Sequence, residues 1–342
     1  MRVLITGTEG YIGSLLAPLL VEHGHEVTGL DTNYFADGRL EGGAEKSFPR
    51  ITKDLRNLTA RDLEGYDAVV HMAGLSNDAL GQLSRRLTYE INHHGSIRLA
   101  AFAKAAGVTR FLYSSSCSVY GRSDEEIVTE TSRLDPQTDY AVSKLLDERE
   151  LADLADDTFS PTFLRNATAY GVSPRMRFDL VVNNLAGMAW TTHQITLISD
   201  GTPWRPIVHA LDICNAFVAA LGARREVVHN AVFNVGRTDE NYQVRDIATA
   251  VANAFPGCAL TLGARDPDQR SYRVSFDKIA RELPAFACAW DLPKGLAQLR
   301  SLFERVQLTD DRFKFRGFSR LDQLKHLVDT GQLDRDFFWT TP

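Results

Sequence analysis

The first 170 residues alternate short apolar runs with segments whose apolar side chains recur at a helical spacing. Residues 3–6 form an apolar run of strand length, and residues 11–23 carry Ile12, Leu15 and Leu19 on one helical face. The alternation continues through predicted strands at 26–30, 67–71, 110–114 and 162–165 and predicted helices at 89–106 and 140–154. This pattern is typical of βαβ units and predicts an α/β fold with a parallel sheet.

Beyond about residue 170 the pattern becomes irregular, and prolines interrupt it. Helices are predicted near 178–190, 210–221 and 244–255, a strand near 233–235 returns to the sheet, and residues 265–342 are expected to hold short elements. The predicted organisation has three parts: a first domain of residues 1–172 with returning segments near 205–240, a smaller interleaved part of residues 173–204 and 241–300, and a C-terminal extension of residues 301–342.

Composition narrows the class of protein. The 342 residues are 44% hydrophobic and 24% charged, as in an ordinary globular chain, and the net charge of −6 disfavours a nucleic-acid partner. No apolar run approaches the ~18–20 residues that cross a membrane, and the N-terminus shows no signal-peptide pattern. The four cysteines form neither a CxxC pair nor a disulfide framework, so we expect a reduced, cytoplasmic protein without a metal.

The first strand runs into the sequence TGTEGYIG, which places Gly7, Gly10 and Gly13 between a strand and a helix. A glycine triplet alone is weak evidence, but this position is the one that dinucleotide binding requires. Gly7 permits a tight turn, Gly10 lets the backbone approach a diphosphate, and Gly13 lets the helix pack closely on the sheet. The helix N-terminus, with Tyr11 and Ile12, then offers free N–H groups to phosphate. The alternative is a glycine-rich turn without a ligand.

Asp31 ends the second predicted strand, about 20 residues after the glycines, where a carboxylate accepts the hydroxyls of an adenosine ribose. A 2′-phosphate there would meet a like charge, and no Arg or Lys follows before Arg39. The pattern therefore favours NAD over NADP as the cofactor, although an Asp at a strand end can also serve a turn. Asp54 and its neighbour Leu55 are placed to meet the adenine.

Tyr140 and Lys144 form a YxxxK pattern, so their side chains lie one turn apart on one helical face. A lysine ammonium beside a tyrosine hydroxyl favours the phenolate, which would lower the pKa of Tyr140 toward working pH. Tyr140 could then take the proton of an alcohol while hydride leaves for a nicotinamide. The pattern is common on exposed helices, but the serines at 114–116 end the preceding strand at the sheet edge where ligands bind.

With these motifs the sequence resembles the extended short-chain dehydrogenase/reductase family, and within it the nucleotide-sugar epimerases and dehydratases. The resemblance covers about residues 1–290 and rests on TGTEGYIG, HMAG at 71–74, SSSCSVYG at 114–121, YAVSK at 140–144 and RPIVHALD at 205–212. It implies a Rossmann-type doubly wound sheet, tightly held NAD and a Ser–Tyr–Lys triad. It also implies a homodimer in which the helices at 89–106 and 140–154 pair.

The resemblance assigns further roles residue by residue. It makes Ser116 the serine of the triad, which hydrogen-bonds the reacting sugar hydroxyl, and it gives Lys144 a second role in holding the nicotinamide ribose. Asn92 matches the family's helix asparagine, which has a supporting role in the cofactor site. The resemblance also implies that the cofactor lies against Met72, Ala73 and Gly74.

The residues after Ser116 narrow the reaction. The family's 4,6-dehydratases carry Asp-Glu after the active-site Thr, whereas this chain has Cys117 and Ser118, which disfavours elimination of water. The 3,5-epimerases place a cysteine two residues before the motif tyrosine, but Cys117 lies three before Tyr120, so a buried, inert thiol is the preferred interpretation. The remaining chemistry needs only the triad and NAD.

Two reactions meet that condition, a 4-epimerisation through a transient 4-keto sugar and a 4-ketoreduction that exchanges its cofactor. The stretch HMAGLSND resembles the HFAGL-type segment of 4-epimerases and favours epimerisation. It makes Ser76, Asn77 and Asp78 candidate contacts of the sugar.

A nucleotide-diphosphate sugar also needs fixed cations, and arginine suits phosphate best. Arg205 matches the family arginine that binds the diphosphate, and Arg270 or Arg273 could be a second clamp, although each alone would be an ordinary surface charge. Asn184 matches the asparagine before the substrate-binding helix. The family usually has Asn where LRNATAYG carries Thr168, which could still donate one hydrogen bond.

Three functions therefore stay open: an NAD-dependent nucleotide-sugar epimerase, an NAD(P)-dependent 4-ketoreductase, and a non-catalytic cofactor-binding scaffold. The intact Ser116, Tyr140 and Lys144 count against the scaffold. His209 and Asp212 are expected to orient a loop and cap a helix. The tail beyond about residue 300 lies outside the resemblance and is assigned to packing or subunit contact.

Overall fold

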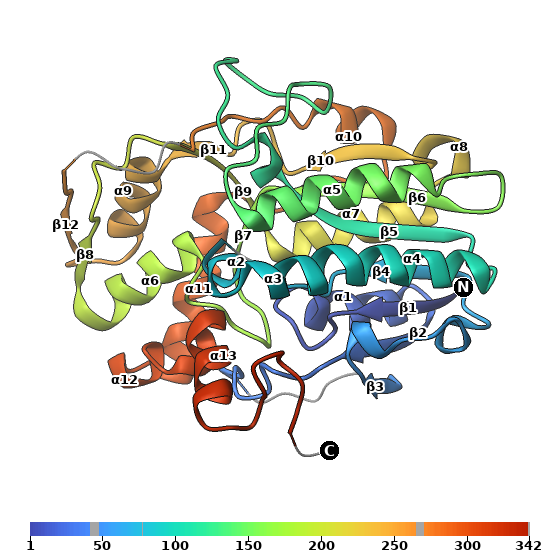
Figure 1. Cartoon of the computed structure of the whole chain (residues 1–342). Helices are drawn as coiled ribbons and strands as arrows, with labels where there is room; N and C mark the ends of the chain where they lie inside the picture. The colour runs from blue at the N-terminus through green and yellow to red at the C-terminus, as the bar shows by residue number, and fades with distance from the viewer. Residues whose placement is uncertain (42–47, 77, 265–269, 341–342) are drawn as a thin grey trace.

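The computed structural model describes residues 1–41, 48–76, 78–264 and 270–340. Its centre is a seven-stranded parallel sheet in the order β10-β6-β5-β4-β1-β2-β3 (Figure 1). The order reverses between β1 and β4, which confirms the predicted Rossmann-type fold. The strands of this sheet are β1 (Arg2–Thr6), β2 (Glu26–Asp31), β3 (Arg50–Thr52), β4 (Ala68–His71), β5 (Arg110–Ser116), β6 (Ser160–Asn166) and β10 (Ala231–Val235).

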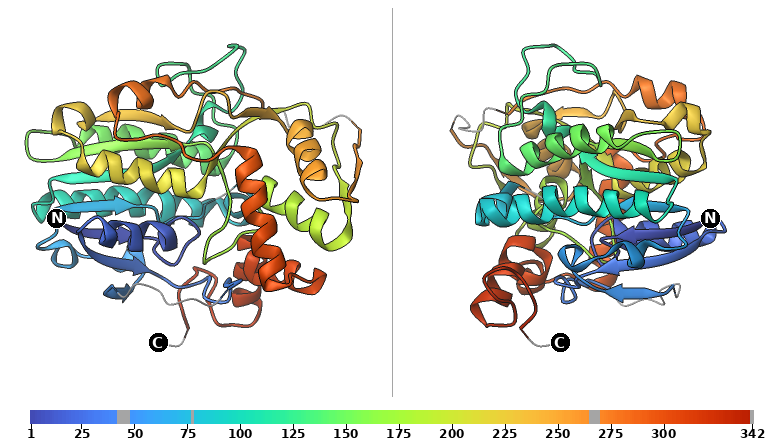
Figure 2. Two further views of the ribbon diagram at one scale, coloured as in Figure 1. Left: turned by 180° about the vertical axis from the view of Figure 1, so that it is seen from behind. Right: turned by 45° about the vertical axis from the view of Figure 1, so that its right-hand side comes forward.

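Helices cover both faces of the sheet, and the strands are apolar because successive side chains point to opposite faces. Val3 and Ile5 pack in one core cluster with α1 (Gly13–Glu22) and α7 (Ala210–Gly222). Leu4 packs in another with α4 (Gly95–Ala105) and α5 (Asp139–Asp153), and Figure 2 shows the two layers from behind and after a 45° turn. The carboxyl ends of the strands are thereby held rigidly at one edge.

The smaller part has its own core, built on a three-stranded sheet in the order β11-β9-β7 and a pair of strands, β12-β8. Residues 168–170 and 205–209 of this sheet lie in ranges that the sequence assigns to the first domain. Its longest helix, α11, has 15 residues, so residues 265–342 hold longer elements than the sequence predicts. The bounds are β7 (Thr168–Tyr170), β8 (Gln194–Thr196), β9 (Trp204–His209), β11 (Asn241–Gln243), β12 (Ala259–Thr261), α6 (Val181–Thr192), α9 (Val244–Ala254) and α11 (Leu292–Val306).

Shorter elements complete the chain. They are α2 (Asp78–Leu83), α3 (Arg85–Thr88), α8 (Arg225–Val228), α10 (Asp277–Glu282), α12 (Asp310–Phe313), α13 (Arg320–Asp329), the 3₁₀ turns η1 (Leu55–Asn57), η2 (Ala60–Leu63), η4 (Cys117–Tyr120) and η5 (Arg316–Phe318), and the π-helical turn η3 (Tyr89–His94). The helix expected at 89–106 is therefore η3 followed by α4. Phe276 and Ile279, which the sequence places in the smaller part, pack in the core of the main sheet.

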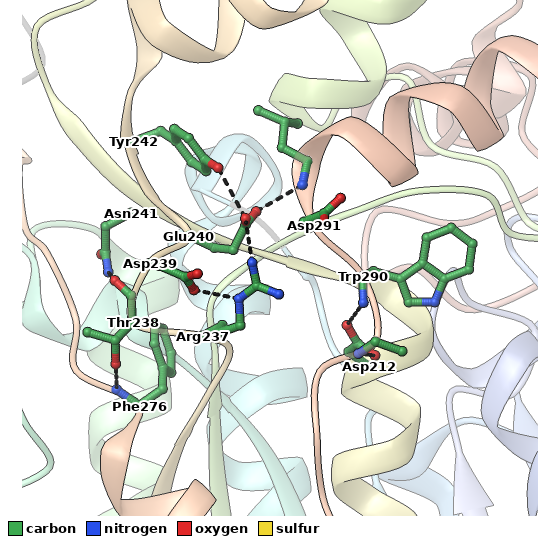
Figure 3. A network of polar contacts seen from close by, with 12 residues as sticks. Asp212, Arg237, Thr238, Asp239, Glu240, Asn241, Tyr242, Phe276, Trp290 and Asp291 are labelled. Carbon is green, nitrogen blue, oxygen red and sulfur yellow. Dashed lines mark hydrogen bonds and ion pairs between the residues drawn. The ribbon is translucent and has the colours of Figure 1, made fainter.

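A network of charged and polar side chains joins the two parts (Figure 3). Glu240, only 5% exposed, accepts hydrogen bonds from the hydroxyl of Tyr242 (3.1 Å) and the backbone N–H of Leu292 (3.0 Å). Asp212, in the first turn of α7, accepts the backbone N–H of Trp290 at 3.1 Å. These bonds fix the start of α11 against α7 and β11, so Asp212 orients a loop as expected.

Candidate active site

A cavity of about 510 Å³ opens at the carboxyl edge of the main sheet, between the glycine loop and the smaller part. This is where ligands bind in open α/β sheets. Most of the side chains that the sequence singles out line it. They are Gly7, Gly10, Tyr11, Ile12, Gly13, Asp31, Asp54, Leu55, Met72, Ala73, Gly74, Ser76, Ser116, Tyr140, Lys144, Thr168, Arg205 and Arg270.

The glycine loop is shaped for a close approach of backbone to ligand. Gly7 has a φ of +83°, which L side chains rarely adopt, and a Cβ there would lie 2.9 Å from the backbone nitrogen of Ala73. A Cβ on Gly13 would lie 2.1 Å from the carbonyl oxygen of Gly7, so only glycine lets α1 begin this close to β1. The turn and the tight packing are the two requirements of a dinucleotide loop.

Asp31 and Asp54 lie at one end of the cavity but differ in what holds them. The carboxylate of Asp31 accepts the backbone N–H groups of Glu9 (2.9 Å) and Asn33 (2.8 Å), which aim it from the end of β2. Burial raises its pKa. The carboxylate of Asp54 forms a bidentate ion pair with Arg56 at 2.9 and 2.7 Å. Asp54 is thus largely occupied by a charged side chain, whereas the Asp31 carboxylate is held by two backbone N–H groups and lines the cavity.

The three residues of the predicted triad meet at the other end of the cavity. Ser116 ends β5 and caps η4, where its hydroxyl accepts the N–H of Ser118 at 3.1 Å. Tyr140 and Lys144 come from the first turns of α5, and the Lys144 Nζ lies 5.9 Å from the centre of the Tyr140 ring. Lys144 donates a 2.8 Å hydrogen bond to the carbonyl of Ser114, which fixes its ammonium at the sheet edge.

The acidity of Tyr140 differs from the expectation drawn from YxxxK. Burial raises the pKa of Tyr140 to about 12, and the charge of Asp78 adds to the rise. A hydrogen bond with Ser116 and the charge of Arg177 lower its pKa but do not offset burial. The prediction that the lysine brings this pKa toward working pH is therefore wrong for the protein alone, because removal from water outweighs the nearby cations.

Lys144 is buried beside carboxylates on its own helix. Burial lowers the pKa of Lys144 to about 8, although Asp147 and Glu148 raise it. Asp147 accepts a 2.8 Å hydrogen bond from the Nδ1 of His93, and the His93 Nε2 lies 3.1 Å from Glu150 at the surface. The lysine thus stands at the inner end of a polar chain that leads out to solvent.

At the substrate end of the cavity, arginines and an aromatic ring face a carboxylate. Arg205 donates hydrogen bonds to the carbonyls of Trp204 (2.8 Å) and Arg270 (2.5 Å), and its guanidinium lies 6.0 Å from the centre of the Tyr272 ring. Arg270 pairs with Asp78 across the cavity. The sequence correctly brings Arg205 and Arg270 together but does not show that Asp78 would engage one of them.

Three predicted site residues do not line the cavity. The side-chain amide of Asn92 accepts a hydrogen bond from the Leu75 N–H at 2.7 Å and donates one to the Leu75 carbonyl at 3.1 Å. Asn92 therefore supports the loop at 72–75 from behind. Asn184 donates to the carbonyl of Phe178 at 2.9 Å and braces the entry to α6. Arg273 lies 5.1 Å above the Trp204 ring, outside the cavity.

Two further side chains complete the account of the predicted site. Asn77 lies outside the described residues. Cys117 is buried, its thiol contacts the carbonyl of Arg165 at 3.2 Å, and burial raises its pKa, so it is a packed, unreactive thiol as preferred from the sequence.

The sequence analysis missed charged residues that the smaller part and the C-terminal extension bring into the cavity. Arg177 is buried, pairs with Asp179 at 2.8 Å and donates to the hydroxyl of Ser76 at 3.2 Å. Arg320, at the start of α13, also lines the cavity. The available signal was the cluster of charges in SPRMRFD, directly after the predicted sheet-edge segment; nothing local marks Arg320.

A seven-stranded doubly wound sheet, a glycine loop at its edge and a Ser–Tyr–Lys group across the same cavity define a nicotinamide-dependent Rossmann enzyme. A model of the NAD dependent epimerase/dehydratase family matches residues 3–236. The chain belongs to this family, and its cofactor is NAD. The described residues hold no group of three potential metal ligands and no helix long and apolar enough to span a bilayer.

Proteins similar to this chain include enzymes with different reactions. A UDP-glucose 4-epimerase of Neisseria gonorrhoeae is 30% identical over 338 residues, covering 87% of this chain and 95% of its own. A dTDP-glucose 4,6-dehydratase of Streptomyces griseus is 28% identical over 307 residues, covering 86% and 92%. The structure of MoeE5 in complex with UDP-glucuronic acid and NAD superimposes with a TM-score of 0.77 at 28% identity, covering 89% and 99%.

Proposed function

We propose that this protein is an NAD-dependent 4-epimerase of a nucleotide-diphosphate sugar. The observation that carries the proposal is the placement of Ser116, Tyr140 and Lys144 at one end of a cavity that the glycine loop and Asp31 line at the other. Cys117, which stands where the family's dehydratases have a carboxylate, is buried outside the cavity, and this favours epimerisation over elimination.

The chain's own residues perform the proton transfer. The glycine loop and Asp31 would hold NAD, which would supply a hydride acceptor, and then a hydride donor, for C4 of the sugar. Tyr140 takes the proton of the C4 hydroxyl as that hydride leaves, and gives it back when the 4-keto sugar, having turned over, is reduced on its other face. Ser116 hydrogen-bonds the same oxygen, and the charge of Lys144, whose Nζ lies 5.9 Å from the centre of the Tyr140 ring, favours the phenolate against the burial that raises the Tyr140 pKa.

Arg205 and Arg270 hold the nucleotide diphosphate in this proposal. Both line the cavity, and a guanidinium recognises phosphate through paired hydrogen bonds. The Tyr272 ring beside Arg205 offers an apolar face to the nucleotide base or sugar. Asp78 lies opposite and can accept a sugar hydroxyl, since a carboxylate is an acceptor with several lone pairs.

The decisive experiment incubates the purified protein with UDP-glucose, UDP-glucuronic acid or dTDP-glucose without added cofactor and follows C4 configuration by proton NMR. An epimerase converts substrate to its C4 epimer catalytically, because each turnover regenerates NAD. A ketoreductase would yield no epimer and would consume added NADH stoichiometrically with a 4-keto sugar. Loss of water from the sugar would instead identify a dehydratase, and either result would overturn the proposal.

The predicted homodimer belongs to the same proposal. α4 and α5 lie side by side on one face of the sheet (Figure 1), as a helical interface between two copies would need. Sedimentation equilibrium of the purified protein at micromolar concentration tests it directly, and a monomer would contradict it.

A further inference from the structure

The C-terminal segment, residues 316–340, packs against the part of the cavity that contains Asp31. Figure 1 shows this red segment beside the blue chain that follows β2. Trp339 donates from its indole Nε1 to the carbonyl of Thr32 at 2.8 Å, and Gln323 donates to the carbonyl of Tyr34 at 3.1 Å. Arg56 reaches back to the carbonyl of Asp336 at 2.7 Å. The segment is therefore hydrogen-bonded to the loop that borders the adenosine end.

An apolar cluster also packs between the C-terminal segment and the rest of the protein. It joins side chains from the cavity wall with side chains from α13 and the chain after it, and all of them are buried. Its members are Tyr34, Leu75, Leu80, Leu87, Leu324, Leu327, Leu333 and Phe337. Burial on this scale makes the C-terminal segment a fixed part of the folded site rather than a tail.

Arg320 is the charged residue that this segment brings to the cavity. Its side chain is 2% exposed, and its Nη1 and Nη2 atoms have no hydrogen-bond partner in the described part of the chain. The guanidinium stacks 4.1 Å above the centre of the Phe35 ring. Burial lowers the pKa of Arg320 to about 9, and Arg177 adds to the effect. A buried cation without a hydrogen-bonding anion is costly, so the site lacks a negative group.

The nearby protein charges do not supply that group. Arg177 is paired with Asp179, and Arg175 is paired with Glu9. Asp179 and Asp31 attract the charge of Arg320, but neither accepts a hydrogen bond from its two terminal nitrogens. The charge of Arg320 is therefore left for a ligand in the cavity.

The position of Arg320 indicates which part of the ligand it meets. On one side its guanidinium stacks on Phe35, in the loop that follows Asp31, whose carboxylate suits an adenosine ribose. On the other, its backbone N–H donates at 3.3 Å to Asp179, the ion-pair partner of Arg177. A dinucleotide that spans from Asp31 to Tyr140 places its diphosphate between them, over the glycine loop. We propose that Arg320 binds the diphosphate of NAD, which makes residues 316–340 a wall of the cofactor site.

This assignment is independent of which sugar the enzyme converts. The guanidinium would add a charge-assisted contact to the phosphates beyond those that the helix N-terminus offers. Because the contact comes from a segment packed over the cavity, it slows the release of NAD. Such retention suits a cofactor that is regenerated in every turnover.

The test compares Arg320→Met with Arg316→Met. Arg316 belongs to the same segment but pairs with Asp37 at 2.8 Å and does not line the cavity. For each variant, dissociation of NAD from the purified holoenzyme is followed by exchange, and calorimetry on nucleotide-stripped protein measures affinity for NAD, ADP, adenosine and UDP. Thermal unfolding of the stripped proteins is recorded in parallel.

We expect Arg320→Met to weaken NAD and ADP by about ten- to a hundredfold, the value of a hydrogen bond to a charged group, and to speed NAD release similarly. The affinities for adenosine and UDP should stay within about twofold of the parent's. Adenosine carries no phosphate and UDP occupies the substrate site, so neither loses a contact with Arg320. The stripped variant should melt no lower than the parent, because an uncompensated buried charge is removed. Arg316→Met should resemble the parent throughout.

Three results would overturn the proposal. Equal weakening of adenosine and ADP would show that Arg320 only packs the site. Weakening of UDP rather than ADP would assign its charge to the diphosphate of the substrate. Unchanged NAD affinity would show that it meets no phosphate. If Arg320→Met does not fold, Arg320→Lys keeps the charge without the paired donors and should weaken NAD and ADP while sparing adenosine.

Discussion

Lys144 and Arg320 are buried cations along one cavity, and their surroundings differ. Lys144 donates to the carbonyl of Ser114 and lies near the carboxylates of Asp147 and Glu148. Arg320 stacks on an aromatic ring and has no hydrogen-bond partner for its two terminal nitrogens among the described residues. Burial lowers the pKa of both, to about 8 for the lysine and about 9 for the arginine.

The difference separates a group that the protein positions for chemistry from one that it holds for a ligand. A catalytic cation must stand at a defined place before substrate arrives, and protein acceptors provide that order. A ligand-binding cation gains most when its donors are satisfied only in the complex, because the cost of burial is then relieved on binding. The two ends of the cavity should therefore respond in opposite ways to substitution.

The largest expected effect separates the two ends directly. Tyr140→Phe removes the proton carrier beside Lys144 and should lower kcat by about 10²–10⁴-fold, the usual contribution of general acid–base catalysis. NAD bound to the purified variant should equal that of the parent, which is the reverse of the result expected for Arg320→Met. Turnover by NMR and cofactor content by absorbance measure both quantities, and unchanged turnover would remove Tyr140 from its catalytic role.

The second largest effect concerns the ion pair that holds a carboxylate near Lys144. Glu148, which follows Asp147 in α5, forms a buried ion pair with Arg165 at 2.6 Å. Arg165→Met leaves that carboxylate buried and unpaired, which should lower the free energy of unfolding by about 3–5 kcal/mol. Chemical denaturation measures the change.

Arg305→Met is the matched control for that substitution, since it breaks an exposed pair with Glu41. Exposed pairs contribute little, and no measurable change in stability is expected. If the two variants were equally stable, the carboxylates near Lys144 would not depend on protein partners, and the contrast with Arg320 would fail.

The sequence predicts the parts of the site whose chemistry is local. The glycine loop and YxxxK are short motifs, and the strand and helix around each fix their side chains at the sheet edge by topology alone. Gly13, Asp31 and Lys144 therefore lie at the cavity as predicted. The alternation of apolar runs likewise sufficed for the parallel sheet, because buried strands leave a continuous apolar signature.

The remaining features depend on packing between distant segments. Arg320 lies about three hundred residues after the glycine loop, beyond the family resemblance, and only the docking of α13 brings it to the cavity. The elevated pKa of Tyr140 reflects burial by several elements, which no spacing encodes. Asn184 matches a family position, but in this chain a local hydrogen bond to Phe178 holds it away from the cavity.

The smallest expected effect concerns the charge on Lys144 itself. Asp147 raises the pKa of Lys144, so Asp147→Asn should lower that pKa below its value of about 8. The ammonium form exists below the pKa, and the variant should therefore lose its charged lysine at a lower pH than the parent. The alkaline limb of kcat/KM should move to lower pH by a fraction of a unit.

The control for Asp147→Asn is Glu150→Gln, which changes a half-exposed carboxylate at the outer end of the same polar chain, 3.1 Å from His93. Glu148, Tyr113 and Tyr140 also face Lys144 and are kept in both variants. The control should keep the parent's alkaline limb, because water screens its charge. If the alkaline limb of kcat/KM stayed in place or moved to higher pH in Asp147→Asn, the Asp147 carboxylate would not help to keep Lys144 charged. The contrast with Arg320, which assumes that protein carboxylates support Lys144, would then fail.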